Sequence, residues 1–76
     1  MPRLPRISGD EAIAALERLG FVALRQKGSH VVLKRESPDG ATGCVIPRHR
    51  ELAEGTLRGA LRQAKVEVNA FIAELR

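Results

Sequence analysis

The chain has 76 residues, and its 13 lysines and arginines against nine acids give a net charge of +4 and an isoelectric point of about 10.2. This length suits one domain with a thin core, so we expect residues 1–76 to form a single domain. One cysteine excludes an internal disulfide, no Cys/His spacing suits zinc, and no window approaches the ~20 apolar residues of a membrane span. With no targeting pattern at the N-terminus either, we expect a cytoplasmic protein without metal, cofactor or membrane contact.

The first predicted element is an amphipathic helix that begins at a capping box, in which Ser8 and Glu11 each bond the other residue's amide. Gly20 is placed to end this helix in a left-handed conformation. Asp10 and Glu11 suit the positive end of the helix dipole, so we interpret them as capping groups and not as a catalytic pair. Residues 1–6 are expected to be a flexible extension. The apolar stripe of the helix is Ala12, Ile13, Leu16 and Leu19.

Residues 21–26 and 31–35 are predicted to be the two strands of a hairpin. The three residues between them include Gly28, which is free to take a positive φ. Because side chains alternate along a strand, one set in the second strand faces the core and the other lies on the opposite, open face. The core set is Val31 and Leu33, and the open set is His30, Val32 and Lys34.

A third strand is predicted over residues 44–46, where Pro47 stops it. The preceding residues 37–43 are rich in turn formers and are expected to be a mobile connection. Cys44 is interpreted as a small apolar residue of this strand and not as a nucleophile, because no base lies beside it in sequence.

Two further amphipathic helices complete the predicted fold, and their apolar stripes are Leu57, Ala60, Leu61 and Ala64, then Val68, Phe71, Ile72 and Leu75. Arg58 and Arg62 lie one turn apart on the exposed flank of the first of these helices. The order of elements predicts an α+β domain with α-β-β-β-α order, a three-stranded antiparallel sheet with helices on one face, and a short extra C-terminal helix.

The cations gather around the predicted hairpin: Arg25, Lys27, Lys34 and Arg35 lie within 11 residues that contain no acid, and Arg48 and Arg50 follow. Such clustering is typical of proteins that bind a polyanion. A solvated basic surface, or a surface for an acidic protein, explains the same charge. Trp and Tyr are absent, so nucleic-acid recognition would rest on backbone charge and shape instead of base stacking.

His30 is the candidate for chemistry, because RNA carries its own nucleophile, the 2′-hydroxyl, and its cleavage needs only a base, cations and a proton donor. An imidazole has an unperturbed pKa of about 6.5 and can be that base near neutral pH. The Ser29 hydroxyl is placed to orient the substrate or the imidazole, and His49 is the obvious candidate for the proton donor. An ordinary surface role for each histidine stays open at this point.

The candidate phosphate contacts are the cations and the amides nearest to His30. Arg25, Lys27 and Lys34 are close to it in sequence, and Gly28 and Ser29 add amide donors.

Three motifs, at residues 25–30, 46–49 and 52–64, resemble the HicA family of bacterial toxins, also called YcfA-like. The resemblance runs from the end of the first helix to residues 71–72. It implies a fold similar to the double-stranded RNA-binding domain and a metal-independent ribonuclease that cleaves mRNA, with His30 as its essential residue. It also implies a cognate HicB-like antitoxin that covers the active site, and phosphate contacts from residues 55–58. The chain departs from the family pattern at Lys65, where a glycine is expected, and at Glu67, where serine or threonine is expected.

The sequence therefore favours a toxin endoribonuclease with His30 as the catalytic residue, assisted by Ser29 or His49. Its expected partners are mRNA and the antitoxin. Two alternatives stay open: an RNA-binding module without catalysis, and an interaction domain that docks an acidic protein. The expected RNA contacts are Arg25, Lys27, Gly28, Lys34, Arg48, Arg58 and Arg62.

Overall fold

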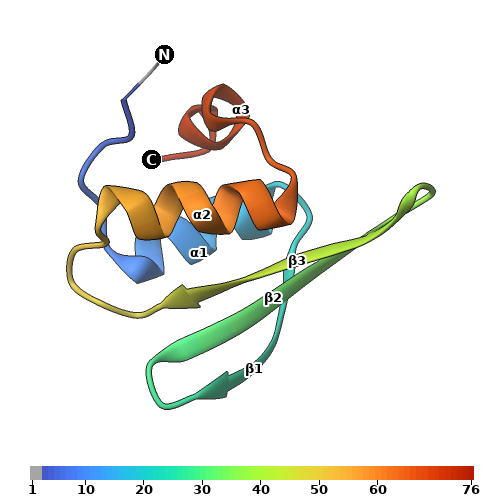
Figure 1. The fold of residues 1–76 in the computed structure, drawn as a ribbon, viewed down its shortest axis with the longest axis horizontal. Coiled ribbons are helices and arrows are strands. Elements are labelled where there is room, and N and C mark those ends of the chain that lie inside the picture. Colours follow the sequence, from blue (N-terminus) through green and yellow to red (C-terminus); the bar gives the residue numbers. More distant parts are fainter. Residues whose placement is uncertain (1–2) are drawn as a thin grey trace.

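The computed structural model describes residues 3–76, in which one helix precedes a three-stranded sheet and two helices follow it (Figure 1). This order confirms the predicted α+β fold. None of the helices in the described residues is long and apolar enough to cross a membrane. In chain order the elements are α1 (Gly9–Arg18), β1 (Val22–Lys27), β2 (His30–Ser37), β3 (Gly40–Pro47), α2 (Glu54–Ala64) and α3 (Val68–Ala73).

The sheet is an antiparallel meander with the order β1-β2-β3, so β2 is its central strand. Val31 and Leu33 are buried toward the helices, whereas His30 and Lys34 are exposed on the other face, which confirms the predicted alternation. All six residues of β1 are exposed, and its pairing with β2 shifts between Ala23 and Arg25. The open face of the sheet therefore has the candidate histidine at one end of its central strand.

Both hairpin turns are shorter than predicted. Lys27 pairs with His30, so the first turn is the two residues 28–29, and Gly28 takes a φ of +59° there. The predicted mobile connection over residues 37–43 is wrong, because Ser37 pairs with Gly40 and β2 and β3 pair over eight residues each. The turn formers after residue 39 lie in a strand because cross-strand hydrogen bonds outweigh their weak strand propensity.

The first helix begins as predicted. The Ser8 amide donates to Glu11 Oε1 at 2.9 Å, and the Glu11 amide donates to Ser8 Oγ at 3.0 Å. Of the segment expected to be flexible, residues 1 and 2 lie outside the described residues. Leu4 is only 6% exposed and belongs to the hydrophobic core, so the described part of this segment packs on the domain.

The core lies between the sheet and the helices. Its largest fully buried side chains come from both layers and are Phe71, Leu16, Leu33, Ile46, Leu57 and Leu61. The predicted apolar stripes of the helices are confirmed, since their residues either belong to the core or pack against it. Lys65, where the family pattern has a glycine, ends α2 in a left-handed conformation with a φ of 57° and a ψ of 45°. Glu67 precedes α3 without a side-chain capping bond.

We expect Lys65→Gly to stabilise the protein. A left-handed backbone costs a residue with a Cβ about 1–2 kcal/mol, which glycine avoids. Glycine gives back about 0.4–1 kcal/mol through its greater freedom in the unfolded chain. The net gain should be roughly 0.5–1 kcal/mol, a rise in Tm of a few degrees in a thermal unfolding experiment. Lys65→Ala is the control, because it removes the same side chain but keeps the Cβ. An equal rise in both variants would show that the backbone conformation is not the cause.

Candidate active site at the first hairpin

The turn before His30 lies where several elements of the fold meet. Figure 1 shows the β1–β2 turn, the end of β3 and the starts of α1 and α2 at one end of the molecule, with the β2–β3 turn at the other. His30 is the first residue of β2 and pairs with Lys27 on one side and Pro47 on the other. Its side chain is exposed. The sheet thus fixes the backbone of His30 while the imidazole remains accessible.

Both carbonyls of the turn accept hydrogen bonds from the protein. Gln26 Nε2 donates to the Gly28 carbonyl at 2.8 Å, and the Arg48 amide donates to the Ser29 carbonyl at 2.7 Å. The groups that this turn can offer to a phosphate are therefore its amides.

Arg48 also holds the turn through its side chain. Its Nε donates to Asp10 Oδ1 at 2.7 Å and its Nη2 to Asp10 Oδ2 at 3.3 Å, while its Nη1 donates to Gln26 Oε1 at 3.2 Å. The hydrogen bond from Arg48 holds the pKa of the Asp10 carboxyl below its usual value, and the same bond raises the pKa of Arg48. Asp10 was expected only to favour the helix dipole. The structure adds a contact with Arg48, 38 positions further along the sequence, which no local pattern indicates.

The start of α1 is held against the end of β3. The Gly9 amide donates to the His49 carbonyl at 2.8 Å. A Cβ at Gly9 would lie 2.0 Å from the Pro47 carbonyl oxygen and 2.8 Å from the Arg48 Cα, so only glycine allows this approach. The contact brings Asp10 within reach of Arg48.

The main chain at His49 lies beside the turn, since its neighbour Arg48 bonds the Ser29 carbonyl. Sequence alone does not place the two histidines near one another. Within residues 3–76 neither imidazole makes a hydrogen bond, and both side chains are exposed. The Ser29 hydroxyl likewise makes no hydrogen bond within the described residues.

The cations of the hairpin lie at different distances from His30. Lys27 is its cross-strand partner, and Arg25 is the partner of Val32, so both pair with residues of the open face. Lys34 is four residues along the strand, which is about 13 Å at the usual rise, and its Nζ lies 3.5 Å from Glu36. Lys27 thus lies directly across from His30, whereas Lys34 lies further along β2.

Arg58 and Arg62 do not gather with these cations. They line a hollow of about 330 Å³ between α2 and the start of α3, together with Val66 and Glu67. Arg58 Nε also donates to Glu54 Oε2 at 3.2 Å. The expected RNA contacts thus form two separate groups.

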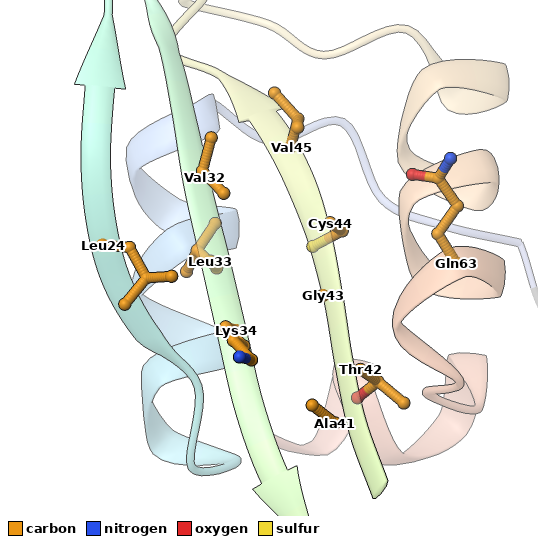
Figure 2. Close-up of a pocket in the computed structure, with 10 residues that line it drawn as sticks. All are labelled: Leu24, Val32, Leu33, Lys34, Ala41, Thr42, Gly43, Cys44, Val45 and Gln63. Atoms are coloured by element: carbon orange, nitrogen blue, oxygen red, sulfur yellow. The ribbon is translucent and has the colours of Figure 1, made fainter.

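A mostly apolar groove beside the sheet does not include His30 (Figure 2). It has a volume of about 540 Å³ and runs along β2 and β3, with Leu24 on one side and Gln63 of α2 on the other. Cys44, which lines it, is 5% exposed, and burial raises the pKa of its thiol to about 11. The thiol is therefore protonated at neutral pH, as the apolar interpretation predicts. No group of three metal-ligating side chains gathers within residues 3–76.

Comparison with protein-family models matches residues 9–66 to a family described as the HicA toxin of bacterial toxin-antitoxin. The matched range is more than half of the chain and contains every helix and strand except α3. Both histidines and the contacts of Arg48 lie within it. No curated protein matches the chain.

We expect Gly9→Ala to lower the stability of the protein, because the added methyl group clashes with main-chain atoms of residues 47 and 48. The expected loss is about 1–3 kcal/mol in a urea unfolding experiment. Gly59→Ala is the matched control, since it lies inside α2 with nothing within 4 Å of its added Cβ. This control should gain about 0.5–1 kcal/mol from better helix propensity. A Gly9→Ala protein as stable as the unaltered chain would contradict the close approach of α1 to β3.

Proposed function

The chain belongs to the HicA family of bacterial toxin–antitoxin systems, and on this premise we propose that it is a toxin that cleaves mRNA, with His30 as the catalytic residue. The observation that carries the proposal is the position of His30. Its imidazole is exposed at the start of the central strand, directly after a turn whose carbonyls are both bonded, and Lys27 lies across the strand.

In the proposed reaction the imidazole of His30 takes the proton of the RNA 2′-hydroxyl. The 2′-oxygen attacks the adjacent phosphorus, the bond from phosphorus to the 5′-oxygen breaks, and that oxygen receives a proton. The products are a 2′,3′-cyclic phosphate and a 5′-hydroxyl, so no metal or cofactor is required. Lys27 and the amides of Gly28 and Ser29 stabilise the crowded phosphate.

The proton donor for the leaving oxygen is His49 in this proposal. Its main chain adjoins the turn, and its imidazole makes no hydrogen bond within the described residues that would hold it elsewhere. The Ser29 hydroxyl is the other group near the phosphate, and it orients the substrate.

The wider RNA surface follows from the separation of the cations. Arg25 and Lys34 bind phosphates on either side of the cleaved one, along the open face. The family resemblance implies a fold similar to the double-stranded RNA-binding domain, so we expect mRNA to be recognised by the charge and shape of its backbone. Arg58 and Arg62 contact RNA only where the strand extends past α2. Residues 3–76 act as one domain, in the cytoplasm where mRNA is found.

The partner in the proposal is a cognate antitoxin of the HicB type that covers His30. It would meet the same exposed cations as RNA does, so an acidic surface suits it. Binding of antitoxin and of RNA would then exclude one another.

We expect His30→Ala to fold normally and to lose RNA cleavage by about 10²–10⁴-fold, the usual contribution of a general base. His30 is exposed, so its removal should change the free energy of unfolding by less than about 0.5 kcal/mol. Cleavage of a short RNA by the purified variant and growth of cells that express it are the measurements. Asn69→Ala, a change at an exposed position in α3, is the control. It should still cleave RNA and still arrest growth.

Undiminished cleavage by His30→Ala protein would remove His30 from the mechanism. RNA that binds to the unaltered protein in a salt-dependent way but is never cut would favour the RNA-binding module instead.

A further inference from the structure

We propose that Asp10, Arg48 and Gln26 form a hydrogen-bonded chain that positions the turn before His30, and that Arg48 acts through this chain instead of contacting RNA. The proposal rests on the function proposed above. The chain runs from α1 through the segment after β3 to β1, and it ends on the Gly28 carbonyl. We refer to it as the Asp10–Arg48–Gln26 chain.

Arg48 bonds the turn by two routes. Its amide donates to the Ser29 carbonyl at 2.7 Å, and its guanidinium holds Gln26, whose amide group donates to the Gly28 carbonyl at 2.8 Å. His30 is the next residue, and its imidazole makes no hydrogen bond within residues 3–76. The position of the imidazole therefore depends on the backbone that these two routes hold.

The Asp10–Arg48–Gln26 chain lies on the helix side of the sheet, whereas the His30 side chain lies on the open face. Paired residues point to the same side of a sheet, and Gln26 pairs with the buried Val31. Arg48 follows Pro47, the partner of His30, so its side chain alternates to the helix side as well. A phosphate in contact with the imidazole thus lies on the opposite side of the sheet from the guanidinium.

Each of the three nitrogens of the Arg48 guanidinium donates one hydrogen bond to a protein group, which engages three of its five N–H donors. Its planar fork fits the two oxygens of Asp10, and its remaining edge donates to Gln26. Asp10 is placed for this because Gly9 fits against Pro47 without a side chain. Removing Asp10 leaves Arg48 with one neutral acceptor, so its orientation toward Gln26 is lost.

The Asp10–Arg48–Gln26 chain contributes more to the position of the turn than to the free energy of unfolding. The side chains of Arg48 and Asp10 are 46% and 64% exposed, and exposed ion pairs add little to the free energy of unfolding. We therefore expect proteins with substitutions at Asp10 or Gln26 to remain folded. A small displacement of a catalytic group still lowers the rate strongly, because productive geometry is narrow.

The experiment compares Asp10→Ala, Gln26→Met and the double variant in single-turnover cleavage of a short RNA, with the Kd for RNA measured alongside. We expect each single variant to lose about tenfold in rate while the Kd changes less than about twofold. The double variant should cleave no more slowly than the slower of the two single variants, because each substitution breaks the same Asp10–Arg48–Gln26 chain. Asp10→Glu, which keeps the carboxylate, should recover part of the rate. Asp39→Ala, the same change of charge at the distant β2–β3 turn, is the control and should cleave normally.

A second readout does not depend on cleavage. Amide hydrogen exchange at residues 28–30 should be faster in Asp10→Ala and Gln26→Met, and unchanged in Asp39→Ala. If the unaltered protein does not cut RNA, the proposed function fails. The exchange measurement would still show whether the Asp10–Arg48–Gln26 chain holds the turn.

Two results would overturn the inference. The first is an unchanged rate together with unchanged exchange in Asp10→Ala. The second is tighter RNA binding by Asp10→Ala at an unchanged rate, because that result would show Arg48 to be an RNA contact that Asp10 restrains.

Discussion

The candidate site depends on Arg48, which bonds the β1–β2 turn directly through its amide and indirectly through Gln26. Every residue of β1 is exposed, so the core holds this hairpin only through β2, in which Val31 is buried. Its order comes from pairing with β2 and from Arg48, which bonds the Ser29 carbonyl directly and the Gly28 carbonyl through Gln26. Arg48 is in turn fixed by Asp10, because the start of α1 approaches β3 closely at Gly9. A buried glycine thus determines the position of an exposed histidine on the other face of the sheet.

This arrangement separates the basic residues by position. Lys27 and Lys34 lie along the open face with His30, where a polyanion can reach them. The guanidinium of Arg48 bonds Asp10 and Gln26, and Arg62 lines the hollow beside α3. Net charge alone does not distinguish these roles, since every one of these residues adds equally to the total of +4. In the proposed mechanism the first group meets RNA beside His30, Arg48 holds the turn, and Arg62 meets RNA only where the strand extends past α2.

Local patterns predicted most of the fold, because a capping box, a 3.6-residue period and strand alternation each involve neighbours in sequence. The capping box of Ser8 and the open-face position of His30 are confirmed. The β2–β3 connection was predicted wrongly, since residues 40–43 resemble a loop until β2 supplies their hydrogen bonds. The bond between Asp10 and Arg48 was missed altogether, because it joins residues 38 positions apart and depends on how α1 meets β3. The catalytic assignment of His30 remains a prediction.

The ends of cleaved RNA test the proposed chemistry most directly. A short RNA of defined sequence is incubated with the purified protein in the presence of a chelator, and the termini of the fragments are identified by mass spectrometry. If His30 activates the 2′-hydroxyl, the upstream fragment carries a 2′,3′-cyclic phosphate, or its hydrolysed form, and the downstream fragment carries a 5′-hydroxyl. Fragments with a 3′-hydroxyl and a 5′-phosphate would contradict the account, because they require attack by water and not by the RNA itself.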